Sequence, residues 1–130
     1  MRILTDTHTI FWALSNPERL SKKATKALSD AAEINVSVVN LWELILKKGR
    51  PNALTNEPAT WWDDLIANND FSVLPVLPEH MIALDQLVPG ENDDHKDPWD
   101  RLLVAQCKSE GLTLVSKDRR LSGYGVPIIW

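Results

Sequence analysis

The sequence holds a single cysteine, Cys107, among 130 residues. One cysteine excludes an internal disulfide, and such sparse use is typical of proteins in a reducing cytoplasm. The first residues, MRILTD, contain no apolar run of signal-peptide length, and no later stretch approaches the length of a membrane span. We therefore expect a cytoplasmic protein with no membrane partner.

An excess of basic residues is also missing. The chain has 14 Lys and Arg against 18 Asp and Glu, a net charge of -4. General nucleic-acid binders usually show a clear basic excess, so the charge does not favour that class, although it allows a binder whose acidity is concentrated in a metal site. A glycine-rich phosphate loop and a dinucleotide fingerprint are absent as well, which argues against ATP and NAD.

Short apolar runs alternate with helical patterns along the chain. The runs predict strands over residues 2–6, 34–39, 71–77, 112–116 and 126–130. Helical spacing and end signals predict helices over 7–14, 20–32, 40–46, 58–68, 78–87 and 98–110. This alternation predicts one α/β domain over residues 1–130, with a mostly parallel sheet and right-handed crossovers.

The stretch HKDPWDRLLVAQC, residues 95–107, places two acids at the start of a predicted helix. Asp97 precedes Pro98 and is expected to be the N-cap, because proline suits the first helical position. Asp100 lies one turn further on, at the capping-box position. Either acid alone is explained equally well by helix capping, so only the rest of the chain favours a functional role.

Four acids fall where an α/β sheet collects its functional groups. Asp6 ends the first predicted strand, Glu43 lies in the helix after the second, Asp100 precedes the strand at Leu112, and Asp118 follows that strand. Ligands of open parallel sheets usually bind beyond the strand C-termini. Clustered carboxylates need neutralising cations or raised pKa values, and an all-oxygen set favours Mg²⁺ or Mn²⁺. For Glu43 an alternative stays open, in which it is the capping-box partner of Asn40.

Zinc and cysteine chemistry are less favoured. His8 and His80 have no recognisable ligand spacing, and His95 has only Asp97 nearby. Cys107 lies on an apolar helix, which is typical of a core residue rather than a nucleophile.

Four stretches, LTDTHTIFWAL, SVVNLWEL, HKDPWDRLLVAQC and LTLVSKDRRLSGYGV, occur in this order along nearly the whole chain. In sequence and spacing they resemble the PIN-domain nucleases, specifically the VapC-type toxins of bacterial toxin–antitoxin modules. The resemblance implies a Rossmann-like three-layer sandwich and Mg²⁺- or Mn²⁺-dependent cleavage of RNA. It assigns the catalytic and metal-binding acids to Asp6, Glu43, Asp100 and Asp118, with Ser116 as the accompanying hydroxyl. Asp97 is expected to cap its helix and support the site.

The resemblance also implies a homodimer and a small antitoxin that places a basic side chain in the acidic site. RNA contact is expected mainly from Lys47, Arg101 and Arg119, with Lys48, Arg50, Lys96 and Arg120 as further candidates, although for each a solvated surface charge is the more common explanation. Trp99 is expected either to stack on a base or to be buried, and Trp12, Trp61 and Trp62 are expected at antitoxin or dimer contacts. Two other functions stay open: a PIN nuclease of RNA processing without an antitoxin, and a non-catalytic module that binds a cation or a basic peptide.

Overall fold

The computed structural model describes residues 1–87 and 97–130. The predictions for His95 and Lys96 lie outside these residues. The elements, in chain order, are β1 (Arg2–Thr5), α1 (Thr7–Ser15), η1 (Pro17–Arg19), α2 (Lys22–Asp30), β2 (Glu33–Ser37), α3 (Val38–Lys47), α4 (Pro58–Asn68), β3 (Ser72–Leu74), α5 (Pro78–Asp85), α6 (Pro98–Glu110), β4 (Thr113–Val115), η2 (Arg119–Tyr124) and β5 (Ile128–Ile129).

The strands form one parallel sheet in the order β3-β2-β1-β4-β5. Strand β1 is central, with Ile3 beside Ile34 of β2 on one side and beside Thr113 of β4 on the other. The chain therefore builds outward from β1 through β2 to β3, and then returns to the opposite side of β1. This reversal puts a topological switch point between β1 and β4.

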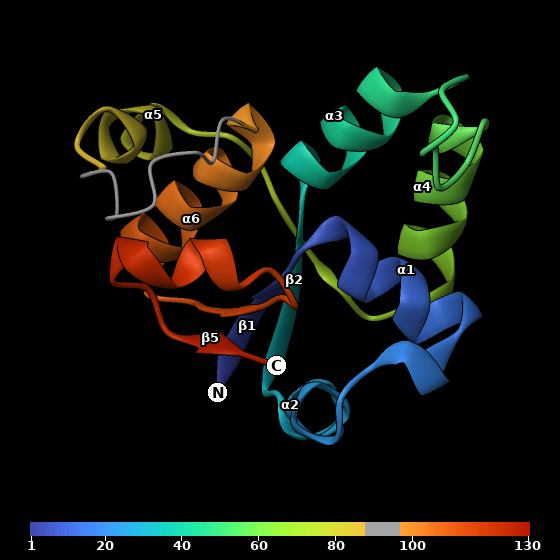
Figure 1. Ribbon diagram of the computed structural model, residues 1–130, viewed down its shortest axis with the longest axis horizontal. Helices are drawn as coiled ribbons and strands as arrows, with labels where there is room; N and C mark the ends of the chain where they lie inside the picture. The colour runs from blue at the N-terminus through green and yellow to red at the C-terminus, as the bar shows by residue number, and fades with distance from the viewer. Residues whose placement is uncertain (88–96) are drawn as a thin grey trace.

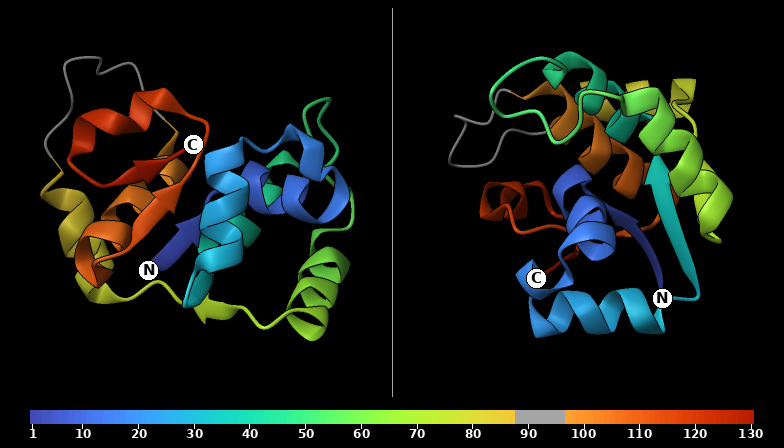
Figure 2. Two further views of the ribbon diagram at one scale, coloured as in Figure 1. Left: turned by 90° about the horizontal axis from the view of Figure 1, so that it is seen from below. Right: turned by 90° about the vertical axis from the view of Figure 1, so that its right-hand side faces the viewer.

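Alternate residues of the strands bury opposite faces of the sheet, since strand side chains alternate. Leu4 and Leu114 pack with α6 and with part of α5, while Ile3 and Val115 pack with α2. On the second face, Val36 packs with α1 and α4. Figures 1 and 2 show the resulting layers, with α5 and α6 on one side of the sheet and α1, α2 and α4 on the other. The predicted three-layer α/β sandwich is confirmed.

Helix α3 begins earlier than the sequence predicts. Ser37 is its N-cap, and its hydroxyl accepts a hydrogen bond from the Val39 amide at 3.0 Å. The Asn40 side chain completes a capping box by accepting from the Ser37 amide at 2.8 Å. The alternative in which Asn40 is the N-cap and Glu43 its capping partner is therefore wrong, because serine at the end of β2 already supplies the cap.

Helix α6 begins and ends where the sequence predicts. Asp97 occupies the N-cap position and Pro98 the first helical position, but the Asp97 side chain makes no capping hydrogen bond. At the other end Gly111 has φ of 68°, a left-handed conformation that favours glycine. Between them, Cys107 is buried in the core as expected. Among the residues described, no helix is long and apolar enough to cross a membrane.

Candidate active site

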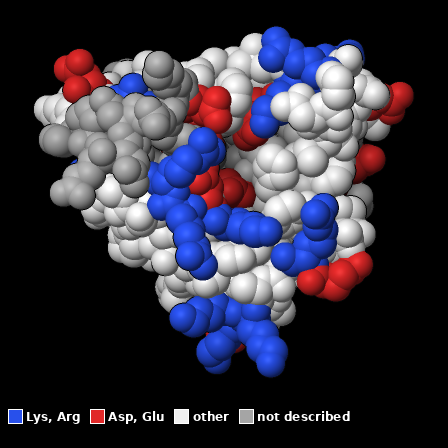
Figure 3. Space-filling view, viewed as in Figure 1, with Lys and Arg blue, Asp and Glu red and all other residues white. Residues whose placement is uncertain are grey.

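A cavity of about 280 Å³ opens beyond the C-terminal ends of β1 and β4, at the switch point of the sheet. Figure 3 shows acidic atoms in its floor and basic side chains around its rim. The lining combines five carboxylates with three cations and four other side chains: Asp6, Glu43, Asp97, Asp100 and Asp118; Lys47, Lys117 and Arg120; and Thr7, His8, Trp12 and Trp99. All four acids predicted from the sequence therefore line one cavity, together with Asp97.

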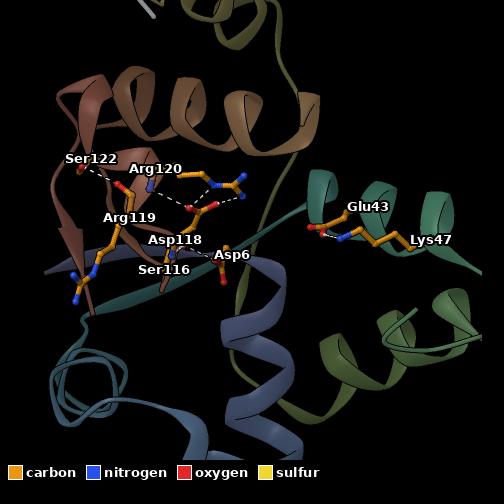
Figure 4. Close-up of polar contacts among 8 residues, drawn as sticks. All are labelled: Asp6, Glu43, Lys47, Ser116, Asp118, Arg119, Arg120 and Ser122. Atoms are coloured by element: carbon orange, nitrogen blue, oxygen red, sulfur yellow. Dashed lines mark hydrogen bonds and ion pairs between the residues drawn. The ribbon is translucent and has the colours of Figure 1, made fainter. Parts of the chain in front are cut away.

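Asp6 is held between two elements. It is the N-cap of α1, where one carboxylate oxygen accepts from the Thr9 amide at 2.8 Å. The other oxygen accepts from the Ser116 hydroxyl at 2.5 Å, at the end of β4 (Figure 4). Burial raises the pKa of Asp6, whereas these hydrogen bonds lower it. The Ser116 hydroxyl thus holds the Asp6 carboxylate in this orientation, and its supporting role in catalysis stays a prediction.

Glu43 points from the second turn of α3 into the cavity, and its side chain is only 6% exposed. Lys47, one turn further on, pairs with it at 2.7 Å. The Lys47 ammonium also lies 5.3 Å from the centre of the Trp99 ring, and Trp42 meets that ring edge-on. Trp99 is therefore half-buried against the core and also forms part of the cavity wall.

Asp118 follows β4 and caps the short helix η2 by accepting from the Arg120 amide at 3.0 Å. Its two carboxylate oxygens also accept from the Arg120 guanidinium at 3.0 and 2.9 Å. The amide of Asp118 in turn donates to the Ser116 hydroxyl at 3.1 Å, which links Asp118 to Asp6 through one serine (Figure 4).

Asp100, like Asp6, has a raised pKa in the cavity. Burial, followed by the charges of Glu43, Asp6, Asp118 and Asp97, raises the pKa of Asp100 to about 8. The negative charge of Asp97 acts on Asp100 from the N-cap position of α6. A carboxyl group surrounded in this way stays protonated at neutral pH unless a cation compensates the cluster.

The structure separates the predicted RNA-contact residues. Lys47 lines the acidic cavity, whereas Arg101 lines a different hollow beside α5 with Met81 and Leu84. The side chain of Arg119 points away from Asp118 in Figure 4. The sequence reasoning did not single out Lys117 or His8 for this site, and it assigned Trp12 to other contacts. For Lys117 a signal was available, because it stands between Ser116 and Asp118.

The donors fit a hard divalent cation, because carboxylate oxygens are the ligands that Mg²⁺ and Mn²⁺ prefer. Within residues 1–87 and 97–130, however, no three acidic, histidine or cysteine side chains stand together as a ready-made ligand set. Lys47 on Glu43 and Arg120 on Asp118 occupy oxygen atoms that an ion would use. The carboxylates of the cavity have the right chemistry for such an ion, and side chains would have to move before three of them could bind it together.

Fold and site together define a class: a three-layer α/β domain with a carboxylate-rich pocket at the switch point of a parallel sheet. A model of the PIN domain matches residues 3–126 of the chain. The protein therefore belongs to the PIN-domain family.

The comparisons also support the VapC-type resemblance. The chain is 30% identical over 127 residues to Ribonuclease VapC22 of Mycobacterium tuberculosis (strain ATCC 25618 / H37Rv), covering 96% of this chain and 93% of that protein. Among solved structures, it resembles DNA-bound VapBC from Salmonella typhimurium, with a TM-score of 0.71, 19% identity and coverage of 98% and 96% of the two chains. FitAcB from Neisseria gonorrhoeae has a TM-score of 0.63 and 20% identity, covering 97% and 95%. These two structures support the fold.

Proposed function

We propose that the protein is a metal-dependent endoribonuclease that acts as the toxin of a type II toxin–antitoxin module, and that residues 1–130 form a single PIN domain. The observation that carries the proposal is the convergence of five carboxylates in one cavity at the sheet's switch point. Membership of the PIN-domain family and the likeness to a VapC ribonuclease support the reaction class.

Asp6, Glu43, Asp100 and Asp118 would hold Mg²⁺ or Mn²⁺ in this proposal. A bound divalent cation supplies an activated water and stabilises the negative charge that develops on the phosphodiester. The protein's own side chains hold these carboxylate ligands in position. Ser116 orients Asp6, and the bond from the Asp118 amide holds the serine hydroxyl in place.

Cations at the rim of the cavity support an approach of RNA to this acidic protein. Lys47, Lys117 and Arg120 line the same cavity as the carboxylates, and Figure 3 shows basic side chains around the acidic floor. Phosphate oxygens would pair with these cations while the scissile phosphate lies over the carboxylates. Lys47 and Arg120 each hold a site carboxylate, so we infer that they turn to the phosphate once a metal ion binds.

We propose an antitoxin and a second copy of the chain as protein partners. The acidic cavity attracts a basic side chain, the means of inhibition implied by the resemblance. Large apolar side chains are exposed on α3, including Trp42, Ile45 and Leu46, and on α5, including Met81 and Ile82. Such side chains suit contacts with a protein partner. Action in the cytoplasm stays a prediction from the single cysteine.

The experiment is cleavage of total cellular RNA by the purified protein with Mg²⁺, with Mn²⁺ and with chelator. We expect discrete fragments that require the metal, and Asp6→Asn should reduce cleavage at least about 100-fold, because an amide is a much poorer ligand for a hard cation. Asp63→Asn, which changes an exposed acid on α4, is the matched control and should cleave normally.

Refolding from denaturant beforehand removes any copurified antitoxin. Equal cleavage by wild type and Asp6→Asn would contradict the assignment of the site. Tight binding of a basic peptide with no cleavage in either metal would favour the non-catalytic module. A small neighbouring gene that encodes a DNA-binding motif would favour a toxin over a nuclease of RNA processing.

A further inference from the structure

Trp12 lies in the second turn of α1, and the proposed metal chemistry assigns it no role. Its indole ring lines the cavity beside the carboxylates and is half-buried. Two rings hold it in position: His8 meets it edge-on at 5.5 Å between centroids, and Trp130 lies tilted at 6.1 Å. The indole is therefore a fixed aromatic surface at the edge of the site.

Two cations from separate elements lie over this ring. The Arg19 guanidinium, from η1, is 4.8 Å from the ring centre, and the Lys117 ammonium, from the turn after β4, is 5.9 Å away. Both side chains are exposed. Two exposed positive charges converging on one indole, next to a pocket suited to a metal ion, are an arrangement that complements an anion carrying an aromatic ring.

Lys117 connects this surface to the site. It stands between Ser116, which donates to Asp6, and Asp118, which lines the acidic floor. An RNA chain whose scissile phosphate lies over the carboxylates would therefore bring its neighbouring nucleotide to Trp12.

We propose that Trp12, Arg19 and Lys117 form a nucleotide subsite of the nuclease, in which an unpaired RNA base stacks on the indole and the two cations bind flanking phosphates. The inference rests on the proposed function and specifies where its substrate binds. It assigns to Trp12 a role in RNA binding in place of the partner contact expected from the sequence.

The strengths of the contacts favour this arrangement. A cation–π contact at an exposed site is weaker than the stacking of a base on an aromatic ring, so Arg19 or Lys117 can turn to a phosphate and leave the indole face to the base. A basic antitoxin side chain would instead meet two like charges here. The charge of the surface therefore favours a nucleic acid over a basic protein segment.

The test measures binding of a labelled single-stranded oligoribonucleotide by fluorescence anisotropy in Mg²⁺, with a gel to follow cleavage. We expect Trp12→Leu to weaken binding about 10-fold and Trp12→Phe to weaken it less than about 3-fold, because phenylalanine keeps a stacking face. Phe11→Leu is the matched control: it lies on the same helix and stacks on Trp61 at 5.6 Å, away from the cavity. It should bind as wild type does.

A second set of oligonucleotides, each with one abasic position, separates stacking from a structural role. Removing the stacked base should weaken binding to the wild type and make no difference to Trp12→Leu, whereas a merely structural Trp12 gives equal losses in both proteins. Thermal melts of all variants check the fold.

The outcomes distinguish the subsite from the function. If wild type binds and cleaves RNA and Trp12→Leu binds equally well, the subsite is wrong and the nuclease stands. If wild type neither binds nor cleaves, both fail. If Trp12→Leu loses the antitoxin while RNA binding is unchanged, the indole is a protein contact and the subsite is likewise overturned.

Discussion

Asp100 shows how a cluster of acids changes the folding stability of the protein with pH. Burial and four neighbouring carboxylates raise the pKa of Asp100 to about 8. An unfolded aspartate titrates near 4, at about 3.9. Between these values the unfolded chain has lost the proton that the folded chain keeps, so the stability of the ion-free protein falls as the pH rises through this window.

We predict that Asp100→Asn stabilises the metal-free protein at pH 8, by roughly 2 kcal/mol, because an amide stays uncharged at every pH. The gain should shrink as the pH falls toward 4 and vanish below it, because the wild-type carboxyl is then protonated in both states. Denaturant unfolding in chelator at a series of pH values measures this difference.

Added Mg²⁺ should reverse the order at pH 8, raising the stability of wild type more than that of Asp100→Asn. Asp63→Asn serves as the control and should not change the slope of stability against pH. A variant that is equally destabilised at pH 4 and pH 8 would show that Asp100 is retained for packing and not for its charge.

At the scale of the element, the start of α3 places Glu43. The Ser37 hydroxyl accepts from the Val39 amide and donates to the Gln106 side chain of α6 at 2.6 Å. The Asn40 amide group donates to the Thr7 hydroxyl at the start of α1 at 3.0 Å. Three helices that carry site acids are thus joined by buried hydrogen bonds at the edge of the sheet.

Ser37→Ala should therefore destabilise the protein by about 2 kcal/mol, because it removes a helix cap and leaves the buried Gln106 oxygen without its donor. Ser21→Ala is the matched control: Ser21 caps α2 by accepting from the Ala24 amide at 3.0 Å, away from the site. It should cost about 1 kcal/mol.

Urea unfolding and RNA cleavage, measured on both variants, separate the two roles. We expect kcat to fall several-fold for Ser37→Ala, because α3 carries Glu43, and to stay unchanged for Ser21→Ala. Equal losses of stability, with full activity in both, would mean that the bond between Ser37 and Gln106 does not position the site.

At the scale of the whole molecule, the positions of the charged side chains matter more than the net charge. The net charge is -4, yet the acidic floor of the cavity is bordered by cations (Figure 3). Arg19 adds another positive charge near the rim, because its guanidinium lies over the Trp12 ring that lines the cavity. The field that RNA meets at the cavity is therefore set by this local arrangement.

RNA binding should weaken with salt despite the net negative charge. With about four phosphate contacts, at Arg19, Lys47, Lys117 and Arg120, the slope of log K against log salt for a single strand should be about -3, and Lys117→Met should reduce it by about 0.7. Anisotropy titrations in KCl at constant Mg²⁺ measure the slope. Lys22→Met, an exposed lysine on α2, is the control and should leave it unchanged. A slope near zero would contradict phosphate binding at this rim.

The elements themselves were largely predictable, because their signals are local. Helix α6 begins at Pro98 and ends before Gly111 as predicted, since proline and glycine act through their own backbone. Strands were predicted too long, and β3 covers only Ser72–Leu74, because a strand's ends depend on its neighbour's pairing. The short helix η2 was missed because it forms around the Asp118 cap.

The sequence by itself determined the parallel α/β architecture and the positions of Asp6, Glu43, Asp100 and Asp118 relative to the strands, because alternation, caps and breakers act over a few residues. Only the tertiary structure decided which charged side chains these acids contact. Lys47 pairs with Glu43, Arg120 with Asp118, and Lys117 approaches Trp12 from a segment far along the chain. The raised pKa of Asp100 likewise depends on its burial and on carboxylates that the fold brings near it from β1, α3 and the turn after β4. Electrostatic coupling depends on distance in space and on exclusion of water, and both are set when the sheet brings its strand ends together.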